Sequence, residues 1–229
     1  MSNKPKIYQT TKRVVDVLLS FSGLVATAPV LAMLALAVRL DSSGPAFFSQ
    51  ERVGRNGRSF KILKLRTMRD GSKGSILTRR DDPRITKTGK MLRRFKLDEL
   101  PQLWNVLKGD MSLVGPRPET RAFVERYPDS YAEILSFRPG ITNPAALALI
   151  DEEALLAQVD EVERFYAEAV LPIKLELYRE YLQRAGLIYD FSLVLKTMKT
   201  IVIRPIRAEN SLELEADILS RWQRIKGKE

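Results

Sequence analysis

The longest hydrophobic stretch of the chain covers residues 17–38, VLLSFSGLVATAPVLAMLALAV, and contains no charged residue. Its length makes it a candidate membrane helix. Pro29 lies near its middle and has no N–H to bond the carbonyl of Val25, so we expect a kink or a break there. Each half is then about 20 Å long, which is short of a hydrocarbon core of roughly 30 Å.

Basic residues flank both ends of this stretch. They are Lys4, Lys6, Lys12 and Arg13 before it, and Arg39, Arg52, Arg55 and Arg58 after it. Because basic segments tend to stay on the cytoplasmic side of a membrane, both ends are expected there. The pattern favours a re-entrant helical hairpin that enters one leaflet and returns. The alternatives are a kinked single span, a signal peptide and a buried core helix.

Residues 46–68 predict two short strands joined by a turn at Gly54 to Gly57. In the second strand, alternation places Lys64 and Arg66 on one face, roughly 7 Å apart. That spacing suits a diphosphate, although it is also typical of an exposed edge strand with solubilising cations. The polar residues 70–84 that follow are expected to form a loop.

Two short helices are predicted next. The apolar residues within 91–95 suit a short amphipathic helix, and those within 100–107 recur at the spacing of a second helix that ends at Gly109. The carboxylates of Asp98 and Glu99 then fall at the N-terminus of the second helix.

The rest of the chain also has helical periodicity. Helices are expected over 118–127, over 151–182 with an interruption at Pro172, and over 191–202. The segment 191–202 and the tail 212–228 combine apolar and basic residues. The segment 191–202 is interpreted either as a core helix or as an amphipathic helix that lies on the membrane surface, and the tail 212–228 as a second such surface helix.

The composition narrows the chemistry, because the 229 residues include no cysteine and no histidine. Disulfides, thiol nucleophiles, Cys/His zinc sites, iron–sulfur clusters and a histidine general base are therefore excluded. A bound metal would be a hard cation with oxygen ligands, and Mg²⁺ is the expected one.

The formal net charge is +10, and residues 52–96 contain 16 Lys and Arg against three Asp. Such a basic segment is expected to bind an anionic partner. A polyphosphate substrate, an anionic membrane surface and a nucleic acid are the candidates.

Asp98 and Glu99 are the candidate catalytic residues. Adjacent carboxylates at a helix start usually serve as caps. Here Arg93, Arg94 and Lys96 precede them, and these cations would keep both carboxylates ionised and attract a phosphorylated substrate. An ionised Asp can attack phosphorus, and carboxylates are natural Mg²⁺ ligands, so both residues are also the candidate metal ligands.

Arg117 lies between two prolines in Gly115-Pro116-Arg117-Pro118. The fixed φ of each proline lowers the entropy cost of presenting a guanidinium group to a phosphate. A tight loop whose arginine faces water is the alternative.

Several segments together resemble the monotopic polyprenyl-phosphate phosphoglycosyl transferases, the bacterial sugar transferase family. They are KRVVDVLLS, the hydrophobic stretch with its Pro29, LDSSGPAFFSQERVGRNGRSFKILKLRTM, LDELPQLWNVLKGDMSLVGPRP and RPGIT, in the family's order. The fourth segment is highly specific.

The resemblance implies a function. A sugar 1-phosphate would pass from a UDP-sugar to polyprenyl (undecaprenyl) phosphate with release of UMP, at the start of capsule, O-antigen, exopolysaccharide or glycoprotein glycan assembly. Asp98 would be the nucleophile of a covalent phosphosugar intermediate, and Glu99 would assist with metal or proton handling. Arg117 would lie near the phosphates. The resemblance also places Lys64, Arg66 and Arg93 in the active-site region.

The expected fold class is α/β and membrane-associated. It comprises an N-terminal re-entrant membrane helical hairpin, a small sheet surrounded by helices, and amphipathic interfacial helices. Residues 1–40 would form the basic N-terminus and membrane helix, and residues 41–229 the cytoplasmic catalytic domain. We expect the protein at the cytoplasmic face of the bacterial inner membrane. Its expected partners are a UDP-sugar, polyprenyl phosphate and the lipid bilayer, and homo-oligomerisation stays open.

A membrane-tethered nucleic-acid-binding or scaffold protein is the alternative from another functional class, because the basic segment could contact a phosphate backbone. That segment contains only Phe60 and Phe95 as aromatic residues, too few for a stacking platform. We therefore expect no nucleic-acid partner.

Overall fold

A computed structural model describes residues 4–72, 74–203 and 209–227. The helices are α1 (Lys6–Asp41), α2 (Lys87–Arg94), α3 (Gln102–Lys108), α4 (Arg121–Arg126), α5 (Pro128–Ile134), α6 (Pro144–Ala148), α7 (Glu152–Leu156), α8 (Val162–Phe165), α9 (Leu171–Arg184), α10 (Leu187–Ile203) and α11 (Glu209–Lys226). Two 3-10 turns, η1 (Arg55–Gly57) and η2 (Leu97–Glu99), and a π-helical turn, η3 (Tyr166–Val170), complete the helical elements. The strands are β1 (Phe47–Val53), β2 (Ser59–Leu65), β3 (Ser112–Val114) and β4 (Gly140–Thr142).

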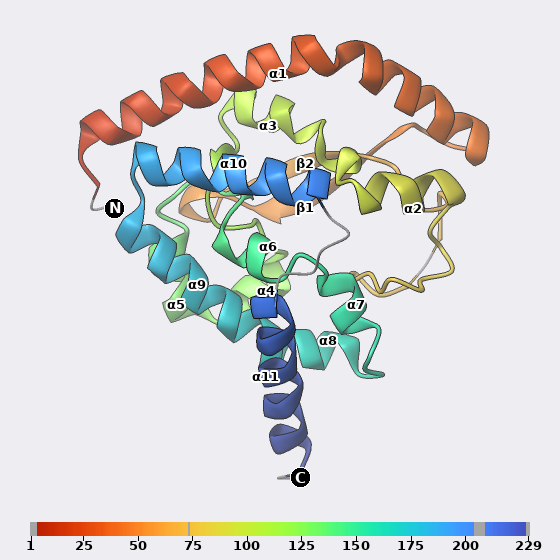
Figure 1. Cartoon of the computed structure of the whole chain (residues 1–229), viewed down its shortest axis with the longest axis vertical. Coiled ribbons are helices and arrows are strands. Elements are labelled where there is room, and N and C mark those ends of the chain that lie inside the picture. The colour runs from red at the N-terminus through yellow and green to blue at the C-terminus, as the bar shows by residue number, and fades with distance from the viewer. Residues whose placement is uncertain (1–3, 73, 204–208, 228–229) are drawn as a thin grey trace.

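Helix α1 is continuous through Pro29 and arches over one side of the molecule (Figure 1). The predicted break is not found, since proline removes a single intrahelical hydrogen bond and the neighbouring residues keep a helical backbone. The Thr27 hydroxyl donates to the Gly23 carbonyl at 2.6 Å, a bond that also favours bending. The predicted hairpin is therefore not confirmed, because α1 is one bent helix. Both of its ends turn toward the body of the protein.

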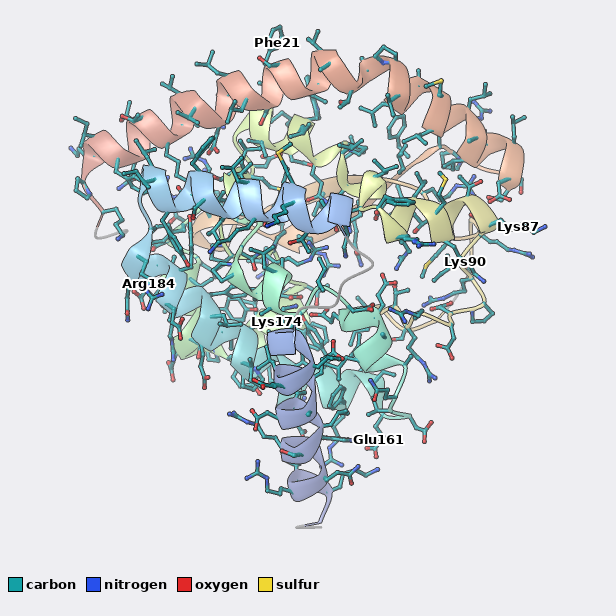
Figure 2. The ribbon with its side chains drawn as sticks, in the orientation of Figure 1. Phe21, Lys87, Lys90, Glu161, Lys174 and Arg184 are labelled. Carbon is teal, nitrogen blue, oxygen red and sulfur yellow. The ribbon has the colours of Figure 1, made fainter. Side chains whose placement is uncertain are left out.

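The outer side of the arch is apolar and exposed. Among the described residues, α1 is the one helix long and apolar enough to cross a membrane. Phe21, 59% exposed, lies at the crest of the arch (Figure 2). Eleven large apolar side chains of α1 are similarly open, which is consistent with membrane association. They are Ile7, Val14, Val15, Leu18, Leu19, Phe21, Val25, Val30, Met33, Leu36 and Leu40.

Polar contacts fasten the first turns of α1 to the rest of the chain. The Lys12 ammonium lies 2.7 Å from the Asp190 carboxylate at the start of α10. Arg13 donates to two carbonyls at the end of α3, and the buried Asp16 accepts the backbone N–H of Leu113 in β3 at 3.1 Å. Helix α1 is thus joined to the rest of the fold at its N-terminal end.

Strands β1 and β2 form an antiparallel hairpin, as predicted, with Phe47 opposite Leu65 and Val53 opposite Ser59. The turn between them uses left-handed backbone at Asn56 and at Gly57. Asn105 of α3 joins the hairpin to the helices. Its side chain accepts the N–H of residue 63 at 2.9 Å and donates to the carbonyl of residue 61 at 2.8 Å. This contact sets the position of α3 relative to β2.

The short strands β3 and β4 pair in parallel, with Ser112 opposite Gly140 and Val114 opposite Thr142. Gly115 and Gly140 pack backbone to backbone, and a Cβ on Gly140 would collide with the Gly115 amide nitrogen. Residues 138 and 139 lead directly into β4. The pairing of β3 with β4 holds the turn that contains Arg117.

The main hydrophobic core lies in the second half of the chain. Its largest fully buried side chains are aromatic and come from α5, α8, η3 and α9: Tyr131, Phe165, Tyr166, Tyr178 and Tyr181. The predicted helical region 151–182 is confirmed, but the interruption falls at residues 157–161, between α7 and α8. Pro172 does not interrupt the region, because it lies in the first turn of α9 directly after the π-helical turn, where no helical hydrogen bond from its nitrogen is needed.

Helices α10 and α11 use their apolar faces differently. Ile188 on α10 is 89% exposed, and Phe191, Leu195 and Met198 are also open, which fits the interpretation of α10 as an interfacial helix. The same interpretation is wrong for α11. Its Trp222 is 2% exposed and packs edge-on against Phe165, and α11 lies at the end of the molecule opposite α1 (Figure 1). Ile218 and Trp222 of α11 are buried in the protein core, and Leu214, Leu219 and Ile225 pack against it.

Candidate active site

A cavity of about 800 Å³ lies between α2, η2, the Arg117 turn, the β4–α6 connection, α7 and α10. We call it the central cavity. Its cationic lining residues are Lys64, Arg80, Lys90, Arg93, Arg94, Lys96, Arg117 and Lys174, and its acidic ones are Asp98, Glu99, Asp151, Glu152 and Glu153. Apolar residues of α3, α6 and α10 form the remaining wall. The cavity is therefore suited to an anionic ligand that also has apolar parts.

Glu99 is clamped between two cations. Its Oε1 lies 2.9 Å from the Lys64 ammonium of β2 and 2.6 Å from the guanidinium of Arg117. Burial by itself would raise the pKa of Glu99, but Arg117 and Lys64 outweigh it and hold the pKa well below its usual range. Glu99 is thus ionised and fixed in one position.

Asp98 lies beside this ion cluster, 5% exposed, with no comparable partner of its own. Its Oδ2 is 3.9 Å from the Lys64 ammonium, and its buried Oδ1 has no hydrogen-bond partner among the described residues. The left-handed backbone of Lys96, with φ of 54°, precedes the 3-10 turn that carries both carboxylates. Helix α3 begins after Pro101 without a side-chain cap, so the interpretation of Asp98 and Glu99 as helix caps is not supported.

Arg93 reaches the same cavity from α2. Its Nε donates to the Thr67 hydroxyl at 2.9 Å, and its guanidinium pairs with Glu153 of α7 at 2.5 Å. The structure therefore brings together five of the residues that the sequence singled out: Lys64, Arg93, Asp98, Glu99 and Arg117.

The chain matches the family described as "Bacterial sugar transferase" over residues 7–204. This chain belongs to the bacterial sugar transferase family. The family is one of transferases, and its membership favours an enzyme over a nucleic-acid-binding or scaffold protein.

Three relatives illustrate the similarity. The Aeromonas hydrophila UDP-N-acetylgalactosamine-undecaprenyl-phosphate N-acetylgalactosaminephosphotransferase is 36% identical over 86% of this chain and 44% of its own length. The galactosyl transferase CpsE of Streptococcus agalactiae serotype III is 38% identical over 84% of this chain and 42% of its own. The Caulobacter vibrioides UDP-glucose:undecaprenyl-phosphate glucose-1-phosphate transferase is 39% identical over 83% of this chain and 69% of its own. The chain thus spans less than half the length of two of these sugar transferases.

Two residues singled out in this bacterial sugar transferase lie away from the central cavity. Strand β2 ends at Leu65, and the buried Arg66 donates to the carbonyls of Pro45 and Ser42 at 2.6 and 2.8 Å. Contrary to the prediction, Arg66 and Lys64 therefore do not lie side by side to bind one diphosphate. The guanidinium group of Arg66 instead binds the loop that follows α1. Pro29 lies on an exposed part of α1.

A second buried cluster of polar side chains adjoins the central cavity, and it was not predicted from the sequence. The Lys174 ammonium lies 3.0 Å from the carboxylate of Glu152, 3.4 Å from that of Glu119 and 2.7 Å from the Tyr166 hydroxyl. Burial alone would lower the pKa of Lys174, but Glu152 and the other anionic neighbours raise it above its usual range. No local spacing in the sequence signals these contacts, because Lys174 and Glu119 lie 55 residues apart.

The carboxylates can accommodate a substrate-bridged Mg²⁺ but not a protein-only cage. No group of three acidic, histidine or cysteine side chains suited to a metal occurs in the described part of the chain. Mg²⁺ usually binds one or two protein carboxylates together with substrate phosphates and water. The unpaired Oδ1 of Asp98 and the Oε2 of Glu99, which has only a 3.4 Å contact to Arg117, fit that requirement.

We expect the stabilisation that Glu99 provides to depend on pH. Because the pKa of Glu99 lies below its ordinary 4.5 in the folded protein, the ionised carboxylate contributes fully above about pH 4.5. The contribution is lost as the pH falls toward the folded-state pKa. In guanidinium unfolding of the detergent-solubilised protein, Glu99→Gln should cost about 2–4 kcal/mol at pH 7 and progressively less below pH 4.5.

Glu125→Gln is the matched control, since Glu125 is exposed and lies 4.0 Å from Arg121. It should change the free energy of unfolding by less than about 0.5 kcal/mol at any pH. A Glu99→Gln cost that stays constant from pH 7 to pH 3 would contradict the pKa assignment.

Proposed function

We propose that this chain transfers a sugar 1-phosphate from a UDP-sugar to polyprenyl phosphate, with release of UMP, and so initiates a bacterial surface polysaccharide or glycoconjugate. The observation that carries the proposal is Asp98, whose carboxylate lacks a partner at Oδ1 beside the Glu99, Lys64 and Arg117 ion cluster. The names of the relatives, which include undecaprenyl-phosphate sugar phosphotransferases, support the same reaction.

In the first proposed step, a carboxylate oxygen of Asp98 attacks the phosphorus atom that bears the sugar. The bond from that phosphorus to the bridging oxygen of the diphosphate breaks, and its electron pair leaves with UMP. Asp98 then carries the sugar phosphate as an acyl phosphate. Within the described part of the chain, Oδ1 of Asp98 accepts no hydrogen bond, which favours this role because such a bond would have to be broken during attack.

In the second step, an oxygen of the polyprenyl phosphate attacks the same phosphorus. The bond to Asp98 breaks, and its electron pair returns to the carboxylate. The product is a polyprenyl diphosphate sugar, and the enzyme regains its starting form.

Lys64 and Arg117 would stabilise the negative charge on the phosphoryl oxygens during both steps. Each is already oriented by Glu99, so little reorganisation is needed when the substrate binds. Glu99 is therefore a positioning residue for the two cations. Arg93 lines the same cavity and adds a further guanidinium for the diphosphate.

Mg²⁺ is the proposed cofactor, and the carboxylates of Asp98 and Glu99 are the residues that would hold it. When bound, it supplies positive charge that offsets the charge of the phosphoryl group.

We expect UMP release to disappear in EDTA and to return when Mg²⁺ or Mn²⁺ is added in excess. EDTA that is saturated with Mg²⁺ beforehand serves as the control for effects of the chelator itself. Full activity in metal-free chelator would remove the metal from the mechanism.

The proposed location is the cytoplasmic face of the bacterial inner membrane, with α1 inserted into one leaflet as a re-entrant helix. Both ends of α1 turn toward the same body of protein, which supports this topology over a straight span (Figure 1). The contacts of Lys12 and Asp16 also hold the N-terminal end of α1 against the part of the protein that contains the proposed catalytic residues.

Labelling of single cysteines tests this topology, since the chain has none of its own. Lys6→Cys and Ser43→Cys flank α1, and Ser220→Cys on the exposed side of α11 is the control. A membrane-impermeant maleimide should label all three in inside-out vesicles and none in right-side-out vesicles. Labelling of Lys6→Cys alone in right-side-out vesicles would establish a spanning helix instead.

The sharpest test concerns the nucleophile. Asp98→Asn removes the nucleophilic oxygen with almost no change in volume, and we expect UMP release to fall by at least about 1,000-fold. Mass spectrometry of the wild-type enzyme with UDP-sugar and no lipid should show a phosphosugar adduct on Asp98. Asp81→Asn, at an exposed loop position outside the cavity, should keep full activity and form the adduct.

Two results would contradict the covalent assignment. One is substantial turnover by Asp98→Asn. The other is kinetics in which UMP appears only after both substrates are bound, because a covalent intermediate releases UMP before the acceptor reacts.

A further inference from the structure

Helix α2 presents charge and apolar surface side by side. Lys90 and Arg94 are four residues apart and exposed, and Met91 and Phe95, 43% and 42% exposed, form the adjacent row. The Arg94 guanidinium lies 5.6 Å from the centroid of the Phe95 ring. Figure 2 shows Lys87 and Lys90 along this helix. Such a surface is complementary to a molecule with an anionic head and an apolar body.

The same helix is fixed next to the membrane helix. Leu92, on the inner side of α2, is fully buried in a small cluster with Val38 of α1 and Leu65 of β2. Helix α2 therefore packs on α1 through its buried side, and its exposed rows belong to a helix that adjoins the candidate membrane helix.

The central cavity reaches the surface at this place. Lys90, Arg94 and Phe95 all line the cavity while remaining exposed. Leu103 of α3 continues the apolar lining inward and packs close to α1, because a Cβ on Gly23 would lie 3.2 Å from a Leu103 methyl carbon. An apolar path thus connects the surface of α1 with the cavity that contains Asp98.

Two groups of lining residues suit different ligands. Lys64 and Arg117 lie at the carboxylates of Asp98 and Glu99, which suits the diphosphate of a sugar nucleotide. Lys90 and Arg94 are accompanied by the apolar Phe95 and Leu103, which suits a ligand with a hydrocarbon chain.

We propose that Lys90, Arg94, Phe95 and Leu103 form the binding site of the acceptor, and we call this the acceptor mouth. The phosphate of the polyprenyl phosphate is bound by Lys90 and Arg94, and its isoprenoid chain runs over Phe95 and Leu103 toward α1. The phosphate then moves from the membrane surface to Asp98 without its chain leaving an apolar environment. This inference rests on the proposed function.

The test measures the KM values of both substrates in nanodiscs of phosphatidylcholine. The double variant Lys90→Ala/Arg94→Ala should raise the KM for polyprenyl phosphate about tenfold, with a much smaller change for the UDP-sugar. Lys87→Ala is the matched control, since Lys87 is an exposed cation of the same helix outside the cavity lining. It should change neither KM by more than about twofold.

Phe95→Ser provides a second, independent variant in case the double variant folds poorly. It should raise the KM for polyprenyl phosphate and have a smaller effect on a short-chain prenyl phosphate, because the short chain reaches less of the apolar lining.

Three outcomes would overturn the acceptor mouth. Unchanged KM values would show that these residues bind neither substrate, and equal increases for both substrates would assign them to the nucleotide. An effect that appears only in phosphatidylglycerol nanodiscs would assign the cations to bulk anionic headgroups. Failure of the proposed function is distinguishable, since the wild-type enzyme would then release no UMP from any UDP-sugar.

Discussion

The buried carboxylate of Glu99 is the constraint on which the site depends. Taking one ion out of water costs several kcal/mol unless it is paired, so Glu99 can remain charged only while Lys64 and Arg117 both reach it. This requirement joins strand β2, the 3-10 turn η2 and the proline-flanked turn in one place. The neighbouring Asp98 then lies close to these cations, while their close ion pairs are made with Glu99.

Features with a local signal could be predicted from the sequence. The β1–β2 hairpin follows from alternation around a glycine-containing turn, and the Asp98-Glu99 pair and Arg117 follow from short motifs. Lys64 was found because a strand fixes where its side chain points. The same argument failed for Arg66, since the strand ends one residue earlier and a buried guanidinium is satisfied by nearby carbonyls.

Features that depend on tertiary packing could not be predicted in this way. The periodicity of α11 is that of any amphipathic helix, and only its packing against Phe165 shows that Trp222 faces protein and not lipid. Pro29 has a known local effect, but a sequence cannot tell whether a helix bends or breaks there. The contacts of Lys174 join segments that are distant in the chain, so no spacing rule reveals them.

The attachment of α1 has a consequence for protein engineering. Deleting the hydrophobic helix to obtain a water-soluble enzyme would remove Arg13 from the end of α3, remove Asp16 from β3, and leave the buried Asp190 without Lys12. Two of these elements adjoin the candidate site, since α3 follows the turn that carries Asp98 and Glu99, and β3 precedes the turn that contains Arg117. A soluble variant is better sought by replacing the outward-facing apolar side chains of the arch with polar ones, so that the inward-facing contacts are retained.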